Sequence, residues 1–134
     1  MTQNKLFSLA GALGLIGVIL GAFGAHALHQ ALADRQTLAV WQTAVSYHLL
    51  HSVALLALAG GWEAVARRSV RLAAAVAWCW TGGVVFFSGS LYGLALGAPR
   101  VLGPVTPVGG LLFLAGWGLL VWIGSRHAPA APPP

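Results

Sequence analysis

Residues 21–51, GAFGAHALHQALADRQTLAVWQTAVSYHLLH, decide the fold. An apolar segment ends within this stretch, a short polar turn follows at Asp34 and Arg35, and a second apolar segment opens with Trp41. The stretch also holds four of the chain's five histidines. A histidine in surroundings apolar enough for a bilayer costs free energy unless it is paired, so such residues are candidates for function. The stretch therefore predicts a membrane hairpin that carries polar groups.

The composition of the whole chain indicates a membrane protein. Of its 134 residues, 58% are hydrophobic and 7% are charged, whereas a soluble domain carries about 25% charged residues. Its uncharged intervals exceed the roughly 20 residues that a spanning helix needs, and they lack the alternation of barrel strands. We expect an all-α, integral membrane four-helix bundle. Its single transmembrane domain covers residues 1–126, with spans at about 6–31, 38–62, 70–96 and 106–125, and residues 127–134 form a disordered tail of mostly alanine and proline.

The net charge of +5 bears on orientation in the membrane. Basic patches bind phosphates, but these basic residues lie singly or in one small cluster at the expected helix ends, so we expect no nucleic-acid partner. One side of the four-span arrangement carries Lys5, Arg67, Arg68, Arg71 and Arg126, and the other carries Arg35 and Arg100. By the positive-inside rule, both termini face the cytoplasm. The expected orientation is N-in and C-in.

The first span is expected to stay in the protein. Lys5, the apolar run after it and the tripeptide Ala25-His26-Ala27 resemble a signal peptide with its cleavage site. The apolar region of a signal peptide is about 7–15 residues long. The uncharged run here extends from Leu6 to Ala33, which is long enough to span the bilayer.

Two sets of glycines predict close helix packing. Gly14, Gly17, Gly21 and Gly24 recur at steps of three and four, which places them on one stripe of the first span. Gly89, Gly93 and Gly97 form a GxxxGxxxG run in the third span. Stripes of this kind let a neighbouring helix approach closely. We expect both stripes to face protein.

The histidines and nearby polar residues predict a cluster inside the bundle. If the first two spans turn about residues 34–37, residues at equal depth have numbers that sum to roughly 71 or 72, which places His26 within about one turn of His48. His51 lies one turn from His48 and shares its face. Gln42 is expected nearer His29 at the interface, and two serines of the third span are expected as further partners. The predicted cluster thus comprises His26, His48, His51, His29, Gln42, Ser88 and Ser90.

Four blocks of the sequence resemble a known family. They are Gly21-Ala-Phe-Gly-Ala-His-Ala-Leu28, Trp41-Gln-Thr-Ala-Val-Ser-Tyr-His48 with His51, Phe87-Ser-Gly-Ser-Leu-Tyr92 and Gly103-Pro-Val-Thr-Pro-Val-Gly-Gly110. In this order they resemble the small membrane proteins called domain of unknown function 423, which are similar to eukaryotic transmembrane protein 256. The resemblance covers nearly the whole chain. It implies a four-helix protein of the bacterial inner membrane, with no established activity and no catalytic residues to assign.

The sequence lacks the usual catalytic motifs. It holds no Walker loop, no G-x-S-x-G, no H-E-x-x-H and no C-x-x-C, and its two acidic residues lie in loops or interfaces, so no carboxylate pair is formed. We expect a non-enzymatic structural, assembly or accessory component without a cofactor. Its partners are the bilayer and other membrane proteins or further copies of itself. Two alternatives stay open: a small-solute channel or transporter, and a haem or metal protein that uses His26, His48 and His51.

Overall fold

The computed structural model describes residues 1–125, and within them the secondary structure is helical. The elements in chain order are α1 (Gln3–Ala25), α2 (His29–Asp34), α3 (Leu38–Gly60), α4 (Trp62–Gly83), the π-helical η1 (Val84–Ser88), α5 (Gly89–Ala95), the 3-10 helix η2 (Arg100–Leu102) and α6 (Val105–Ser125). The prediction of an all-α protein is confirmed. The predicted tail at residues 127–134 lies outside the described residues.

Four helical segments are long and apolar enough to cross a membrane. They are Gln3–Ala25, Leu38–Gly60, Trp62–Ala95, which joins α4, η1 and α5, and Arg100–Ser125, which joins η2 and α6. The two shortest have 23 residues each. At 1.5 Å per residue this length is about 35 Å, which exceeds the roughly 30 Å hydrocarbon core of a bilayer. The prediction of four membrane-spanning helices is confirmed.

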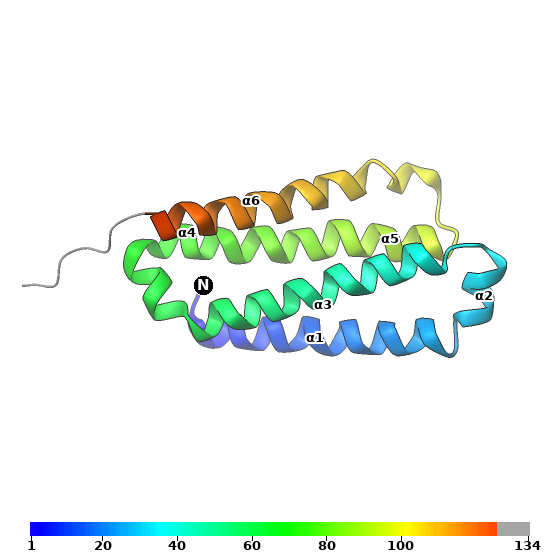
Figure 1. Ribbon diagram of the computed structural model, residues 1–134, viewed down its shortest axis with the longest axis horizontal. Helices are drawn as coiled ribbons and strands as arrows, with labels where there is room; N and C mark the ends of the chain where they lie inside the picture. Colours follow the sequence, from blue (N-terminus) through cyan, green and yellow to red (C-terminus); the bar gives the residue numbers. More distant parts are fainter. Residues whose placement is uncertain (126–134) are drawn as a thin grey trace, which may run out of the picture.

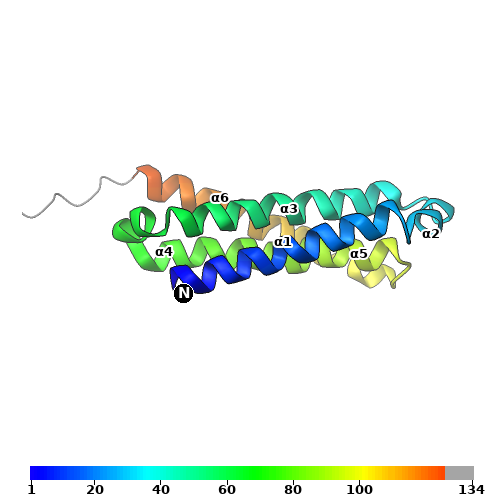
Figure 2. The same cartoon turned by 90° about the horizontal axis from the view of Figure 1, so that it is seen from below.

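The four spans run side by side along one axis, each antiparallel to the one before it (Figure 1, Figure 2). α1 packs mainly against α3, and α6 packs mainly against α4 and η1, while α3 contacts η1 and α5 in the middle. The bundle therefore consists of two helix pairs that meet through α3. The N-terminus, the α3–α4 connection and the end of α6 lie together at one end, here called the N-terminal end; α2 and η2 lie at the other, here called the α2 end (Figure 1).

The first span is shorter than the predicted range of 6–31. α1 ends at Ala25, and His26 leaves helical geometry at φ −123° and ψ −84°. After this break α2 crosses the α2 end and buries Leu32 completely against Trp41 and Ala95. A continuous helix would carry Leu32 away from these residues. The break is therefore explained by packing at the α2 end.

The third span bends near the membrane surface. α4 begins at Trp62, but Ser69 has extended backbone geometry at φ −169° and ψ 106°. The Ser69 hydroxyl accepts a hydrogen bond from the backbone N–H of Leu72 at 3.3 Å, which is the arrangement of an N-cap. Residues 62–68 therefore form a short helical piece across the N-terminal end (Figure 1), and the straight part of the span starts after Ser69.

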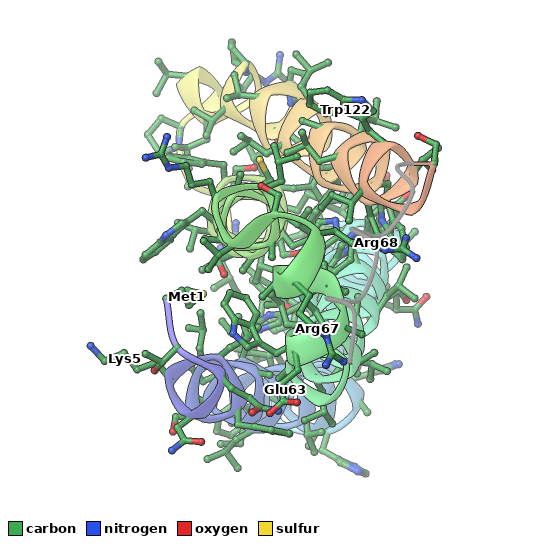
Figure 3. All side chains as sticks on the ribbon, turned by 90° about the vertical axis from the view of Figure 1, so that its left-hand side faces the viewer. Met1, Lys5, Glu63, Arg67, Arg68 and Trp122 are labelled. Carbon is green, nitrogen blue, oxygen red and sulfur yellow. The ribbon has the colours of Figure 1, made fainter. Side chains whose placement is uncertain are left out.

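Arg68, in the first part of α4, binds the end of α6. Figure 3 looks onto the N-terminal end, where Lys5, Arg67 and Arg68 lie. Arg68 Nη1 donates hydrogen bonds to the backbone carbonyls of Ile123 and Gly124, both at 3.2 Å. The last carbonyls of a helix lack partners within that helix, and a positive charge beside them is favourable. Arg68 thus caps α6 from a neighbouring helix.

The glycine stripe of α1 faces α3. A Cβ atom added at Gly14, Gly17, Gly21 or Gly24 would meet Ser52, Leu49, Val45 or Trp41 respectively, which all belong to α3. The closest approach is at Gly24, where the added atom would overlap the indole of Trp41. This indole donates a hydrogen bond through Nε1 to the backbone carbonyl of Leu20 at 3.0 Å. Glycine at position 24 is therefore required for the hydrogen bond between the two helices.

The predicted stripe of the third span does not form a helix contact. Gly89 has no neighbour within 4 Å of an added Cβ atom, and a Cβ atom added at Gly93 would lie 3.0 Å from Leu102 Cδ1, outside α6. Gly97 has a φ of +91° and lies beside the guanidinium of Arg35. Gly97 follows the end of α5, and its positive φ is a conformation that residues other than glycine rarely adopt. Its role is therefore to end the helix. The prediction was wrong because α6 approaches a different face of this span.

The contact with α6 depends on other glycines. An added Cβ atom at Gly83 would overlap the ring of Phe113, and one at Gly109 would overlap the backbone of Phe87. One at Gly116 would overlap the indole of Trp80. α4 and α6 therefore both supply glycines to their interface, and none of these glycines belongs to the predicted GxxxGxxxG run.

We expect Gly24→Ala to lower the stability of the protein. The new methyl group must displace the Trp41 indole and break its bond to Leu20, and overpacking of this kind costs about 1–3 kcal/mol. The control is Gly11→Ala, because no atom lies within 4 Å of the added Cβ atom at that position. Thermal unfolding of both variants in mild detergent tests the expectation. Equal melting temperatures for Gly24→Ala and the wild type would contradict it.

Candidate functional site

Five buried polar side chains lie in the centre of the described bundle. They are His48, His51, Ser52, Ser88 and Ser90. They come from α3 and from the η1–α5 part of the third span, which pack against each other. All except Ser52 are members of the predicted cluster. The Ser52 hydroxyl donates to the backbone carbonyl of His48 at 2.8 Å, so its polarity is satisfied within α3.

His51 is bonded at both ring nitrogens. The Trp117 indole donates from Nε1 to His51 Nε2 at 3.2 Å, and His51 Nδ1 lies 2.8 Å from the backbone carbonyl of Tyr47. An indole N–H can only donate and a carbonyl can only accept. Nε2 must therefore be the acceptor, and Nδ1 must carry the proton and donate it. These two contacts define a neutral ring with a single tautomer.

The His51 ring is also held by aromatic contacts. It stacks on Phe113 of α6 with 3.6 Å between ring centroids and 12° between ring planes. Trp80 of α4 and Trp117 of α6 approach it edge-on, each with centroids 6.3 Å away. Its position is thus defined by three helices. Trp117 and Phe113 are site residues that the sequence reasoning missed; the indole in the fourth span was the available signal, because a buried Trp N–H usually needs an acceptor.

His48 makes a different set of contacts. Its Nδ1 lies 3.3 Å from the hydroxyl of Tyr92 on α5. Its Nε2 is buried and makes no well-formed hydrogen bond within the described residues, although the backbone of Leu13 in α1 lies beside the ring. Gly17 gives the ring access to α1, since an added Cβ atom there would lie 3.4 Å from His48 Cδ2. His48 therefore sits between the first and third spans.

The predicted pairing of His26 with His48 is not formed. His26 is exposed at the end of α1, and His29 is exposed at the start of α2. The depth calculation assumed that the first helix continues to the turn, whereas α2 folds across the bundle after Ala25. The buried histidines are consequently His48 and His51 alone among residues 1–125.

His29 and Gln42 line one crevice at the α2 end. It lies between α1 and α3 and has a volume of 320 Å³. Both side chains belong to the predicted cluster, and the structure places them together around this crevice, apart from the buried histidines. The crevice also contacts Trp41 and Ser46 of α3. The polar residues of the hairpin are therefore divided between a buried group and a surface group.

The two serines of the third span flank a π-helical turn. The Ser90 hydroxyl donates to the Phe87 carbonyl at 2.9 Å and contacts the Thr106 hydroxyl at 2.7 Å. A serine hydroxyl has one proton, so Thr106 is the donor in the second contact. Ser88 is buried without a hydrogen-bond partner in the described residues. Wide turns of this type often occur at functional sites, and here the turn meets Gly109 of α6.

A larger groove opens between α3 and α6 beside His51. Its volume is 560 Å³. Tyr47, Phe87, Phe113 and Trp117 supply an aromatic wall, and α6 adds small and apolar side chains. The Tyr47 hydroxyl has no hydrogen-bond partner among residues 1–125. The groove is therefore apolar with one free polar group at its edge.

The described residues do not assemble a metal centre of the usual kind. No group of three or more His, Cys, Asp or Glu side chains within residues 1–125 could hold a metal ion. The His51 nitrogen that lacks a proton already accepts from Trp117. The arrangement can fix helix positions through hydrogen bonds and stacking, and it presents to the bilayer an apolar groove and a mostly apolar crevice bordered by His29, Gln42 and Ser46.

Comparisons with known proteins identify the family. The family described as "Protein of unknown function (DUF423)" matches residues 20–110. A UPF0382 membrane protein of Staphylococcus haemolyticus is 46% identical over 118 residues, which is 87% of this chain and 93% of the relative. The UPF0382 membrane protein YwdK of Bacillus subtilis is 38% identical over 124 residues, 92% of this chain and 98% of the relative.

Relatives also occur in a eukaryote. A UPF0382 membrane protein of Schizosaccharomyces pombe is 36% identical over 126 residues, which is 87% of this chain and 98% of the relative. No solved structure matches the chain. The identities, their coverage and the family match agree with the four membrane-spanning helices of the structure. The chain belongs to the DUF423 family, whose relatives are named UPF0382 membrane proteins.

Proposed function

We propose that this protein is a non-enzymatic accessory component of the membrane, which packs beside another membrane protein. The observation that carries the proposal is the bonding of His51 at both ring nitrogens to Trp117 and Tyr47. A histidine that acts as a base or a ligand must offer its unprotonated nitrogen to a substrate or a metal, and that nitrogen of His51 is taken by an indole N–H. The bond from Trp117 holds α3 and α6 at a fixed relative height, and the bond to Tyr47 within α3 fixes the orientation of the ring.

The geometry favours this proposal over a haem or metal protein. In the alternative, His26, His48 and His51 supply ligands, but His26 lies exposed at the end of α1 while the other two are buried. His51 would have to give up the hydrogen bond from Trp117 before its Nε2 could bind a metal. An indole N–H without an acceptor is costly inside a bilayer, where no water can replace the histidine. The contacts therefore favour a structural role for the histidines.

The groove between α3 and α6 is the proposed binding site for the partner membrane protein. It lies along two antiparallel spans and is lined by aromatic rings, so a transmembrane helix with an apolar face would fit it. The Tyr47 hydroxyl at its edge has no partner within the described residues. In a bilayer an unpaired hydroxyl is unfavourable, and a hydrogen-bond acceptor on the partner helix would satisfy it.

The structural role of His51 predicts a loss of stability in Trp117→Phe. The substitution leaves His51 Nε2 as a buried acceptor without a donor, which costs about 1–3 kcal/mol. Trp78→Phe is the control, because Trp78 is 62% exposed and packs outside the core. Replacing both partners, as in His51→Phe with Trp117→Phe, should recover part of the loss, since no polar group then stays unpaired.

Unfolding in detergent, followed by intrinsic fluorescence or circular dichroism, measures these changes. His51→Phe, Trp117→Phe and the variant that combines them form a double-mutant cycle, which isolates the coupling energy between His51 and Trp117. Additive losses in the double variant would show that the hydrogen bond contributes nothing to the register of α3 and α6. That result would count against the proposal.

The binding site for the partner can be tested by photo-crosslinking in native membranes. A photoreactive residue at Leu111, which lines the groove and is 66% exposed, should form an adduct with one protein of defined mass. The matched control is the same residue at Leu15 of α1, which is 63% exposed on a face that lines none of the described pockets. We expect adducts with lipid only from the control. Lipid adducts alone at both positions would contradict the proposed partner.

We also propose that both termini face the cytoplasm and that the protein lies in the inner membrane. The N-terminal end carries Lys5, Arg67 and Arg68 (Figure 3), whereas the α2 end carries Arg35 and Arg100. Positive residues favour the cytoplasmic side. Reporter fusions after residues 34 and 100 should score as external. A cytoplasmic score after residue 34 would reverse the assigned orientation.

A further inference from the structure

The crevice at the α2 end has a floor of glycine and a wall of tryptophan. Gly21 and Gly24 line it from α1, and Trp41 and Val45 line it from α3. The Trp41 indole cannot swing into the crevice without losing its hydrogen bond to Leu20. The space of 320 Å³ is therefore maintained by a fixed side chain. Its floor and wall are apolar, as suits a hydrocarbon chain.

Three polar side chains around this crevice have no partner. They are His29, Gln42 and Ser46, and none of them makes a hydrogen bond within residues 1–125. Other hydroxyls of α3 behave differently: Thr43 and Ser52 each donate a hydrogen bond to the backbone carbonyl four residues earlier, at 2.9 and 2.8 Å. The polar groups of the crevice thus remain available to a ligand.

The positions of these side chains match the polar part of a lipid. Gln42 and Ser46 are one helical turn apart, about 6 Å along the axis, in the outer part of a span that begins at residue 38. His29 starts α2, which crosses the end of the bundle. A ligand bound here would extend from the headgroup region of the bilayer into its hydrocarbon core. The acceptors that a bilayer offers over this interval are the phosphate and the ester carbonyls of a glycerophospholipid.

The crevice lacks a fixed charge. The Asp34 carboxylate accepts a hydrogen bond from the Gln30 amide at 2.8 Å. The Arg35 guanidinium lies against Gly97 at the end of α5, and neither Asp34 nor Arg35 lines the crevice. Recognition must therefore come from neutral donors, which suits carbonyl oxygens better than a charged headgroup.

We propose that this crevice binds one glycerophospholipid through its ester carbonyls. The amide of Gln42 and the hydroxyl of Ser46 donate to these carbonyls, one acyl chain lies over Gly21 and Gly24, and His29 faces the headgroup. The site recognises the diester backbone and discriminates little among headgroups. It is separate from the groove beside His51 and does not require a partner protein.

The experiment compares diester and diether lipids of the same headgroup and chain length. A diether lipid lacks the carbonyl acceptors but has nearly the same shape. Purified protein in mild detergent is mixed with equal amounts of both lipids, and bound lipid is counted by native mass spectrometry. We expect the wild type to retain the diester about 25-fold more often, because each of the two hydrogen bonds, at ordinary strength, supplies a ratio of about five.

The variants assign this preference to the crevice. Gln42→Leu combined with Ser46→Ala should bind both lipids equally. Thr43→Val is the matched control, because Thr43 is the next residue on the helix and its hydroxyl is bonded to Ala39; it should keep the preference. Equal retention of the two lipids by the wild type would overturn the proposal, as would an unchanged preference in the double variant or its loss in Thr43→Val. Melting temperatures in the same detergent confirm that each variant is folded. Should the double variant prove unfolded, Gln42→Leu alone is measured instead, and it should reduce the preference about fivefold without abolishing it, because Ser46 still donates.

Discussion

This structure depends on hydrogen bonds that form without water, and α3 takes part in a hydrogen bond with each of the other three spans. Within a bilayer, a buried polar group is costly unless it finds a partner in the protein. Trp41 bonds to the first span, His48 reaches Tyr92 on the third, and His51 accepts from Trp117 on the fourth. α1 and α6 pack mainly on single neighbours. Polar contacts from one central helix therefore fix the relative heights of the other three.

The long apolar spans could be predicted from the sequence because they depend on local composition. The break after the first span could not, since the residues that follow Ala25 are histidine, alanine and leucine, with no glycine or proline to end the helix. It follows from the burial of Leu32 against Trp41 and Ala95, which are 9 and 63 residues away in the chain. The end of a helix at His26 is thus a consequence of tertiary packing. The error in span one then carried over into the depth assigned to His26.

The buried histidines were partly predictable for a related reason. His48 and His51 share a helical face, which spacing alone reveals. Their partners Tyr92 and Trp117 lie 44 and 66 residues away. Trp117 belongs to a span that is not adjacent to α3 in sequence, and spacing within one helix does not show which residue of another span meets His48. The GxxxGxxxG run failed likewise. A small-residue motif shows that a helix can be approached closely, but the neighbour's position decides which face is used.

The extent of the family match separates two kinds of contact in this bundle. The match covers residues 20–110, which includes both partners in the Trp41–Leu20, His48–Tyr92 and Ser90–Thr106 bonds. It also includes every residue that lines the crevice at the α2 end. The bond from Trp117 to His51 has one partner outside the matched range. The contacts that lie wholly inside this range are near the α2 end and in the middle of the bundle. The groove beside His51 depends in addition on Leu111, Phe113 and Trp117 of α6, so the crevice lies wholly inside the matched range and the groove lies partly outside it.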